Sequence, residues 1–385
     1  MDNRPGTKAC ILLLFAALAP AWRAAEAKVV FTGYADMRFA LDTRNTLSGG
    51  PFPNPLEKRD FTLPAVGIFA ATNLEKNCSF YADITYSKLG YTAGETRLQY
   101  AYLQYDLSPS MDIKVGRIRL PLGLYNDLYF YPFQRLTIQP PLFQGEILGL
   151  PIADLGVSFH KEFAAKAFHT EFTLFGVNGY GTSPGDTTKT KFREISATGI
   201  RISNNLGSTN NNHDIARGGR LEFNKLGGRD IRLGISHYSG TWDPDSKKDL
   251  MILNYYAQAT IARFGFIVER LHLKVDGDAG MRASFGVSDW KADGTYAELN
   301  YLLHRFEGEK PLHAFLQWDS TTAKGVGGGT TKEKLAYSGI GLAYKPLSGM
   351  TMKAALTHLE YDLPLLGFNL EADTRGLLFG LAVSF

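Results

Sequence analysis

The sequence has little cysteine and no long hydrophobic run beyond its N-terminus. Only two of its 385 residues are cysteines, Cys10 and Cys78. After residue 27, no stretch reaches the ~20 apolar residues that a membrane-spanning helix needs. Cys10 lies in the leader described below, so the mature chain retains a single cysteine and cannot form an intramolecular disulfide. These absences exclude a disulfide-stapled scaffold and a bundle of transmembrane helices.

A strong excess of charge of one sign is also absent. The chain has 41 Lys and Arg against 38 Asp and Glu, a formal net charge of +3, and 21% charged residues. Disordered chains and nucleic-acid-binding domains are both marked by strong charge imbalance. We therefore expect an ordered protein with no nucleic-acid partner.

The residues that are abundant favour strands and turns. The sequence contains 40 Gly, 25 Phe and 19 Tyr. Aromatic residues are enriched in β-strands, and glycine is enriched in the turns that join them. The composition therefore predicts an all-β fold.

The N-terminus has the pattern of an export signal. Arg4 and Lys8 precede an apolar run at residues 9–21, and the small residues of a cleavage site follow at 25–27. This pattern predicts a signal peptide over residues 1–27 and export through the Sec pathway. A membrane anchor is the alternative, but the apolar run is short for one.

Segments with a period of two recur along the rest of the chain. In one of them Met251, Leu253 and Tyr255 share one face, and Asn254 and Gln258 share the other. The same division appears in three other segments, at residues 78–89, 295–306 and 312–320. Such alternation is typical of strands with one apolar face.

Two architectures give strands one apolar face, a sandwich with an apolar interior and a membrane barrel with an apolar exterior. The segments are about ten residues long, which suits a tilted strand that crosses a bilayer. Tight links are expected at Asn73–Asn77, Ser108–Ser110, Leu226–Asp230 and Pro346–Gly349, and long loops at residues 42–60, 178–215, 276–294 and 321–332. Alternation of short turns and long loops favours the barrel.

The number of segments predicts the size of the barrel. Seventeen segments can be counted, but bacterial single-chain barrels have an even number of strands. We interpret residues 191–202 as loop and predict a transmembrane antiparallel β-barrel of about 16 strands, formed by residues 28–385 as one domain. A barrel of that size encloses a water-filled lumen.

The final ten residues form an apolar strand that ends on an aromatic residue. Phe379, Leu381, Val383 and Phe385 alternate with smaller residues. This pattern resembles the C-terminal signal of Gram-negative outer-membrane barrels, which implies recognition by the barrel-assembly machinery. In a closed barrel this strand has to pair with the first one, near Val29–Leu41, because an open edge in lipid leaves backbone groups unpaired.

A second stretch, at Val115–Pro141, resembles a conserved segment of a porin family related to the phosphate-selective and other trimeric porins. In that family Gly-Arg-x-x-x-Pro-x-Gly leads from a strand into a loop folded toward the lumen. The matching positions are Gly116, Arg117, Pro121, Gly123, Tyr125, Asn126, Arg135 and Pro141. The resemblance implies a homotrimer in the outer membrane. The sequence departs from the family around Asp127–Pro132, which is unusually aromatic.

The same segment has a physical interpretation of its own. Pro121 lacks an N–H and Gly123 permits backbone angles that strands do not use, so the strand ends here and the chain turns. We expect the loop after the fifth strand to lie in the lumen. The candidate residues for the pore constriction are Lys114, Arg117, Arg119, Tyr125, Asp127, Arg135 and Glu146. Basic groups in a narrow pore favour anions. Alternatively, the arginines bind loop carbonyls to the wall or lie at a subunit contact.

Two other groups of residues give weaker evidence about function. The five aromatic residues of the loop either form a stacking path for solutes or pack the loop against the wall: Tyr125, Tyr129, Phe130, Tyr131 and Phe133. The eight histidines are scattered and never approach metal-ligand spacing. We therefore expect neither a metal nor a cofactor.

These patterns predict a porin for passive diffusion of small hydrophilic solutes, with a weak anion preference and no enzymatic activity. It would lie in the outer membrane of a Gram-negative bacterium, surrounded by lipid and lipopolysaccharide. Two alternatives remain, a barrel enzyme of the protease or phospholipase type and a channel for hydrophobic or aromatic ligands. The first needs a compact His-Ser-Asn or Asp-His arrangement, and the second needs a plug.

Overall fold

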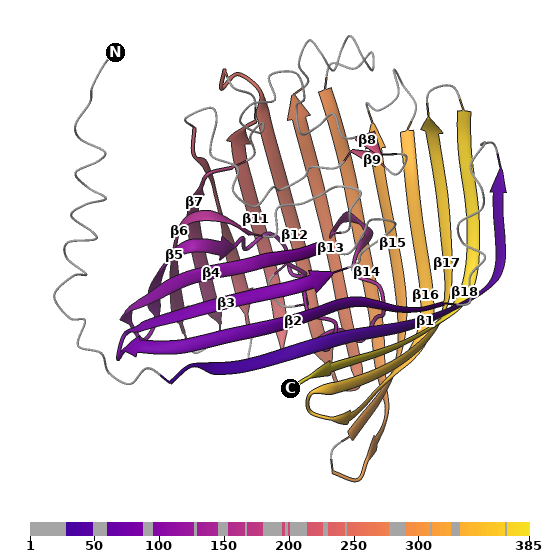
Figure 1. Ribbon diagram of the computed structural model, residues 1–385, viewed down its shortest axis with the longest axis horizontal. Helices are drawn as coiled ribbons and strands as arrows, with labels where there is room; N and C mark the ends of the chain where they lie inside the picture. The colour runs from indigo at the N-terminus through magenta and orange to yellow at the C-terminus, as the bar shows by residue number, and fades with distance from the viewer. Residues whose placement is uncertain are drawn as a thin grey trace.

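The structure is a computed structural model (Figure 1). It describes residues 28–48, 60–87, 95–126, 129–144, 153–165, 168–179, 195–196, 199–200, 214–225, 230–242, 245–276, 289–308, 310–324, 332–365 and 368–385. The predicted signal peptide, residues 1–27, lies outside these ranges and stays a prediction.

Sixteen antiparallel strands form one closed barrel, as the alternating segments predicted (Figure 1). The order around the ring is β1-β18-β17-β16-β15-β14-β13-β12-β11-β10-β7-β6-β5-β4-β3-β2. Apart from the closure between β1 and β18, each strand of the ring therefore pairs with the ring strands that precede and follow it in the sequence, and β8 and β9 stand outside the ring. The all-β fold class is confirmed.

The strands are bounded as follows. The first half of the ring contains β1 (Val30–Ser48), β2 (Asp60–Glu75), β3 (Cys78–Ser87), β4 (Glu95–Ser108), β5 (Met111–Arg119), β6 (Ala153–Ala164), β7 (His169–Val177) and β10 (Ala216–Asn224). The second half contains β11 (Ile231–Thr241), β12 (Asp249–Ile261), β13 (Phe264–Asp276), β14 (Asp289–Phe306), β15 (Lys310–Lys324), β16 (Lys332–Leu347), β17 (Met350–Leu365) and β18 (Phe368–Ser384).

The described residues within 191–202 lie outside the barrel, in agreement with the interpretation of this stretch as loop. Within them, β8 (Ile195–Ser196) and β9 (Gly199–Ile200) form a separate two-stranded sheet.

Three of the predicted long loops are shorter than expected. β1 continues to Ser48, β14 begins at Asp289, and β15 and β16 reach Lys324 and Lys332. The predicted strand ends were placed where the alternation of apolar and polar residues stops. The backbone ladder continues beyond that point because its hydrogen bonds do not depend on the polarity of the side chains.

The barrel closes between β1 and β18, as predicted. Their register pairs Phe39 with Phe379 and Tyr34 with Ser384. At the end of the seam, the amide of Phe385 donates to the carbonyl of Gly33 at 2.9 Å, and the amide of Gly33 donates back at 2.7 Å. The closing strand therefore leaves no open edge. Its proposed role as an assembly signal stays a prediction.

The two faces of the barrel differ in polarity. On the outside, exposed apolar side chains follow the strands, among them Ile84, Val157, Leu233, Leu316, Ile340 and Leu356. The alternate positions face inward and include buried polar residues, among them Asp83, Ser158, Ser236, Asn254, Glu269 and Asp319. This apolar exterior and polar interior match the transmembrane barrel and not the sandwich.

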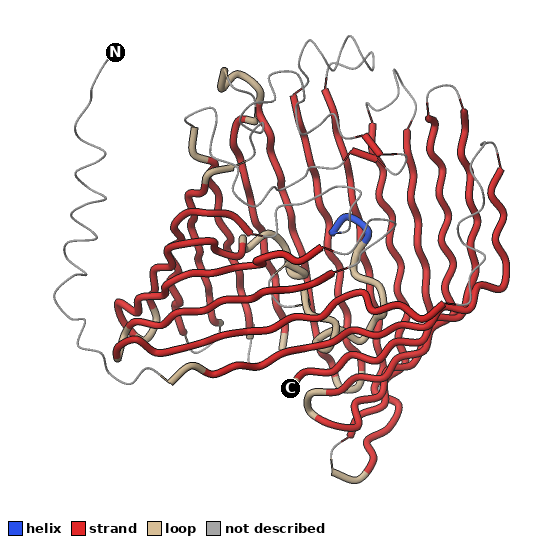
Figure 2. The backbone as a smooth tube through the Cα atoms, in the orientation of Figure 1, coloured by secondary structure: helices blue, strands red, loops and turns tan. Residues whose placement is uncertain are grey.

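Helix is nearly absent from the described residues (Figure 2). The 3-10 helix η2 (Leu142–Gln144) is short and lies in the segment between β5 and β6. No helix in the described part of the chain is long and apolar enough to cross a membrane.

The apolar exterior leads to a test of membrane placement. Ile340 on β16 is 56% exposed on the outer face. We expect Ile340→Arg to lower the free energy of unfolding in phospholipid vesicles by about 2–4 kcal/mol, because a guanidinium would have to enter hydrocarbon. The control is Ala336→Arg, four residues along the same strand and beyond the exposed apolar positions, where we expect a change under about 1 kcal/mol. Urea titration measures both, and equal losses would contradict an apolar band at Ile340.

Candidate functional site

The candidate site begins where β5 ends and the chain turns away from the barrel wall. Gly116 has φ +132°, and a Cβ there would lie 2.5 Å from the carbonyl oxygen of Ala101. Three residues later β5 ends at Arg119, and Pro121 follows without an N–H to extend the ladder. We call residues 120–144 the β5–β6 segment; Asp127 and Leu128 within it lie outside the described residues.

Gly123 lies against the inner faces of β11, β12 and β13. Its amide donates to Ser236 Oγ at 2.9 Å, and its φ is +73°. A Cβ at this position would lie 2.0 Å from Oε1 of Glu269 and 2.7 Å from Nδ2 of Asn254. Only glycine fits here, for reasons of backbone conformation and of space.

Glu269 and Asn254 form a buried pair that receives the turn. Asn254 Nδ2 donates to Glu269 Oε1 at 2.7 Å, and neither side chain is exposed. The Glu269 carboxylate also accepts hydrogen bonds from the backbone amides of Leu124 and Tyr125. A carboxylate that receives several donors fixes the position of the turn on this wall.

The aromatic residues of the segment bond to the barrel wall and to other residues of the segment. The Tyr125 hydroxyl lies 3.1 Å from the hydroxyl of Tyr296 on β14 and 3.2 Å from Thr137 Oγ1. Gln258 Nε2 on β12 donates to the Tyr129 hydroxyl at 2.6 Å. Burial raises the pKa of the Tyr125 hydroxyl, so it stays protonated and can donate. These contacts correspond to the packing alternative for the aromatic residues.

Arg119 lies in an aromatic cage beside a buried carboxylate. Its guanidinium carbon is 4.8–4.9 Å from the ring centroids of Tyr100, Phe130 and Tyr131. The guanidinium also bonds to the Tyr131 hydroxyl and lies 3.7 Å from Asp83 Oδ2 on β3. Tyr131 in turn donates to Asp83 at 2.7 Å. Arg119 thus holds the segment to β3.

Arg135 and Lys353 hold the central part of the segment through its carbonyl groups. Arg135 is 4% exposed and donates to the carbonyls of Phe130 and Ile138 at 3.4 and 3.3 Å. Burial lowers the pKa of its guanidinium. Lys353 on β17 donates to the carbonyls of Pro132 and Thr137 at 2.7 and 2.9 Å. Both cations act as structural ties, which was the alternative interpretation of the loop arginines.

The segment contacts opposite sides of the ring. Its end bonds to Asp319 on β15 through the Leu142 amide, and Arg38 on β1 donates to Gln139 Oε1 at 3.0 Å. β3 and β13, which hold Tyr131 and the turn at Gly123, lie eight positions apart in the ring of sixteen. The inward side chains that receive the segment are therefore not gathered on one wall.

Three of the predicted constriction residues need separate comment. Arg117 pairs in register with Leu155, which is exposed on the outer face, and its Nε donates to the Leu98 carbonyl at 2.8 Å. Residues paired across an antiparallel ladder share a face, so the register associates Arg117 with Leu155 and not with the segment, and a role in the constriction stays a prediction. Asp127 and Glu146 lie outside the described residues.

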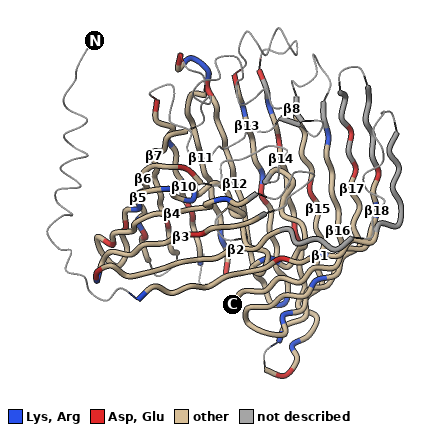
Figure 3. Tube along the Cα trace, in the orientation of Figure 1, with Lys and Arg blue, Asp and Glu red and all other residues tan. Residues whose placement is uncertain are grey.

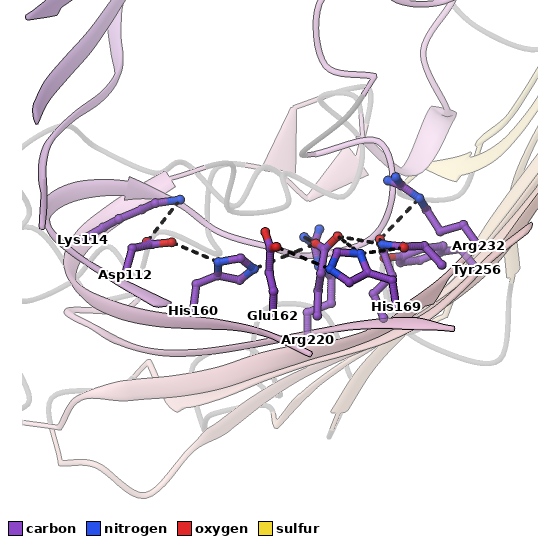
Figure 4. Close-up of polar contacts among 11 residues, drawn as sticks. Asp112, Lys114, His160, Glu162, His169, Arg220, Arg232 and Tyr256 are labelled. Atoms are coloured by element: carbon purple, nitrogen blue, oxygen red, sulfur yellow. Dashed lines mark hydrogen bonds and ion pairs between the residues drawn. The ribbon is translucent and has the colours of Figure 1, made fainter. Parts of the chain in front are cut away.

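Lys114 belongs to a second group of polar residues on the inner wall (Figure 4). Its Nζ lies 3.9 Å from Asp112 Oδ1, and Asp112 Oδ2 lies 3.0 Å from His160 Nδ1. We call this group the carboxylate–histidine row. It runs along the inner faces of β5, β6, β7, β10, β11 and β12 and comprises Asp112, Lys114, His160, Glu162, His169, Glu171, Arg220, Glu222, Asn224, Arg232 and Tyr256.

The charges of the row are paired across neighbouring strands. Arg232 Nε lies 3.3 Å from Glu222 Oε1, and Arg220 Nη2 lies 3.9 Å from Glu171 Oε2. His169 Nε2 lies 3.4 Å from Glu162 Oε2. Several members reach water from the inner face, with Lys114 and Arg232 32% and 27% exposed. The row therefore combines both charges along a partly hydrated wall.

The row does not have the geometry of a metal site. No group of three or more His, Cys, Asp or Glu side chains that could hold a metal ion occurs in the described ranges. Each histidine of the row faces carboxylates at hydrogen-bonding or ion-pair distance, and Figure 4 shows these contacts along the wall.

The residues that anchor the segment were not predicted as site residues. Asp83 and Asp319 were recognisable only as inward positions of alternating strands, and Glu269 and Lys353 were not singled out. Their sequence signal is a charged residue on the polar face of a strand. That signal does not tell which inward charges meet a loop, because the contacts join residues from 48 to 221 positions apart.

Comparison with known proteins supports the fold without assigning a family. No family model matches the chain. An uncharacterized protein of Aquifex aeolicus (strain VF5) is 22% identical over 313 residues, which cover 75% of this chain and 67% of that protein.

Several solved structures have the same fold at low sequence identity. An anion-selective porin from Comamonas acidovorans matches with a TM-score of 0.58 at 11% identity, covering 93% of this chain and all of that one. The outer membrane channel DcaP of Acinetobacter baumannii matches with a TM-score of 0.54 at 10% identity, covering 93% and 97%. A loop-deletion mutant of OmpT, an outer membrane protein of Vibrio cholerae, gives 0.53 at 10%, covering 94% and 100%. The chain therefore has the barrel fold found in outer-membrane porins and channels.

Proposed function

We propose that the protein is an outer-membrane porin of a Gram-negative bacterium, a water-filled channel for passive diffusion of small hydrophilic solutes. The observation that carries the proposal is the β5–β6 segment, which bonds to β3 on one side of the ring and to β13 on the other. A segment held in this way crosses the lumen and narrows it. The carboxylate–histidine row, which lies on the strands between β3 and β13, then lines the hydrated path beside the segment.

The proposal includes a weak anion preference that has a different origin from the one the sequence suggested. Arg119 and Arg135 hold the segment in place, and Arg117 pairs across the ladder with the outward residue Leu155. In two ion pairs of the row the cation is the more exposed member: Lys114 is 32% exposed against 14% for Asp112, and Arg232 is 27% against 1% for Glu222. Glu162 and Glu171 in the same row oppose this bias, so the preference is weak.

An enzyme is the less favoured function. Asp112 Oδ2 lies 3.0 Å from His160 Nδ1, which resembles the pairing of the carboxylate and the histidine base in a catalytic triad. The other nitrogen of His160, Nε2, faces the carboxylate of Glu171 at 4.0 Å. A nucleophile activated by a histidine base has to lie within hydrogen-bonding distance of that nitrogen. The geometry therefore supports a hydrated wall more than a catalytic site.

The homotrimer, the absence of a cofactor and assembly by the barrel machinery remain parts of this proposal.

Planar-bilayer recordings test the channel. We expect the wild-type protein to give open channels in KCl and a small reversal potential toward anions that declines as salt rises, because screening acts over ~8 Å at physiological ionic strength. Lys114→Glu should move the reversal potential toward cations with little change in conductance. Arg217→Glu is the control, since Arg217 lies exposed on the outward-facing side of β10. Absence of conductance from a correctly folded wild-type barrel would overturn the proposal.

A further inference from the structure

Near the tight-turn ends of the strands, charges of opposite sign lie on opposite walls of the lumen. β6 and β16 are eight positions apart in the ring of sixteen strands, and so are β7 and β17, so each pair faces across the barrel. β6 and β7 carry Glu162 and Glu171 on their inner faces. β16 and β17 carry Lys345 and Lys353. Figure 3 marks the charged positions along the strands.

The acidic wall contains a pair of carboxylates that the protein compensates only in part. Glu162 and Glu171 are cross-strand partners, and like charges directly opposite destabilise a sheet. Arg220 Nη2 lies 3.9 Å from Glu171 Oε2. Within the described residues, Glu162 has an ion-pair contact only with His169, at 3.4 Å, and a histidine is charged only when protonated. Glu162 is 40% exposed, so its carboxylate can receive a cation from the lumen.

The basic wall contains an ammonium group without a counter-charge. The charged groups that act on or respond to Lys345 include Lys353 on β17, His313 on β15 and Glu298 on β14, which places its side chain inside the barrel. In the described part of the chain the Lys345 ammonium makes neither a hydrogen bond nor an ion pair. Glu298 is 6% exposed and accepts hydrogen bonds from two residues of its own strand. Lys345 is therefore free to receive an anion.

Other charges near the two walls do not reverse these signs. Most of them are paired with each other: the pairs are Asp36–Arg38, Asp112–Lys114 and Glu222–Arg232. Arg305, a charged neighbour of His313, adds to the basic wall. Asp106, the cross-strand partner of Asp112, adds to the acidic wall. The walls therefore keep opposite signs.

The two walls together identify a class of solute. We propose that they bind short peptides with free termini, with the terminal carboxylate at Lys345 and the terminal ammonium at Glu162. A charge-assisted hydrogen bond forms at each end, and each supplies the counter-charge that the wall lacks. The inference rests on the proposed water-filled channel and assigns a solute class to it.

The width of the lumen sets the length of the peptide. A ring of sixteen tilted strands about 4.8 Å apart measures roughly 30 Å across its backbone. Stacked sheets pack about 10 Å apart, so side chains take up about 5 Å on each wall and leave roughly 20 Å between them. An extended peptide of five residues is about 17 Å long at ~3.4 Å per residue. Five residues with a contact at each end therefore span the lumen.

The test measures peptide binding to the folded full-length protein in neutral detergent by isothermal titration calorimetry, so channel activity does not enter. The probes are pentaglycine with free ends, its N-acetyl form, its C-terminal amide and the form with both caps. Two unit charges about 4 Å apart in water contribute a factor of about five, so we expect each cap to weaken binding about fivefold. Triglycine, about 10 Å long, cannot reach both walls, so one cap should have little effect on it.

Substitutions on the two walls should each reproduce one cap. Lys345→Gln should weaken binding of free pentaglycine about fivefold and leave binding of the C-terminal amide unchanged. Glu162→Gln should do the same for the free peptide and leave the N-acetyl form unchanged. The control is Lys161→Gln, the neighbouring position on β6, which shares the outer face with the exposed Phe163. We expect wild-type binding of all four peptides by this control.

Several outcomes would overturn the proposal. Equal affinity for the four forms of pentaglycine would show that the charged ends are not bound. Sensitivity to the C-terminal cap alone would indicate a simple anion site. Equal loss in Lys161→Gln and Lys345→Gln would assign the effect to overall charge. A failed conductance experiment with normal discrimination among the peptides would count against the channel and not against this site.

Discussion

Removal of the β5–β6 segment is expected to raise single-channel conductance several-fold. β5 ends at Arg119 and β6 begins at Ala153, and these two residues are partners in the register of adjacent strands. A turn of about four Gly and Asn residues can therefore replace residues 121–151 without stretching the wall. The barrel should persist because the ladder hydrogen bonds of β5 and β6 stay in place. The physical reason for the increase is that the inward groups that now hold the segment would face water.

We also expect the deletion variant to admit larger solutes than the wild type does. Glu269, Asp319 and Lys353 are buried under the segment in the wild type. Once hydrated, they would line a wider lumen, and larger sugars should enter proteoliposomes in a swelling assay. Heat-modifiable migration on gels and a strand-type circular dichroism spectrum establish that the variant is folded. A folded deletion variant with wild-type conductance and size cut-off would show that the segment does not form the constriction.

The barrel was predictable from the sequence because its signal is local and repeated. Alternation such as Met251, Leu253 and Tyr255 against Asn254 needs only the pleat of a strand, and the burial pattern of β12 repeats it. The ends of the strands were less predictable. β14 extends back to Asp289 through charged outward positions that lie beyond the apolar band, where alternation of hydrophobicity gives no signal.

The site was only partly predictable, for a related reason. Pro121 and Gly123 marked the turn because their backbone requirements are local. The partners of the turn, Glu269 and Asn254, are brought there by barrel closure and register. The arginines were assigned to the pore from their charge and from their position around this turn. Charge does not distinguish Arg135, which is buried among loop carbonyls, from Lys114, which reaches water.

The turn itself can be tested by one methyl group. Gly123 and Gly308 both have φ +73°, a conformation that costs an L-residue about 1–2 kcal/mol. Their surroundings differ. A Cβ at Gly308 would meet only Lys310 Cε at 3.7 Å, whereas a Cβ at Gly123 would lie 2.0 Å from the carboxylate of Glu269. The pair of alanine variants thus separates backbone strain from the contact between segment and wall.

We expect Gly308→Ala to lower the free energy of unfolding by about 1 kcal/mol and to leave conductance unchanged. Gly123→Ala should cost about 2–5 kcal/mol, the sum of backbone strain and of overpacking against a buried pair. Because the buried Glu269 and Asn254 cannot move aside without losing their hydrogen bond, the segment has to shift. That shift should appear as larger and noisier single-channel currents. Urea unfolding in vesicles and bilayer recordings measure the two effects. If Gly123→Ala matched Gly308→Ala in both, the turn would not be held by Glu269, and the constriction would depend on the other anchors, among them Lys353, Asp83 and Asp319.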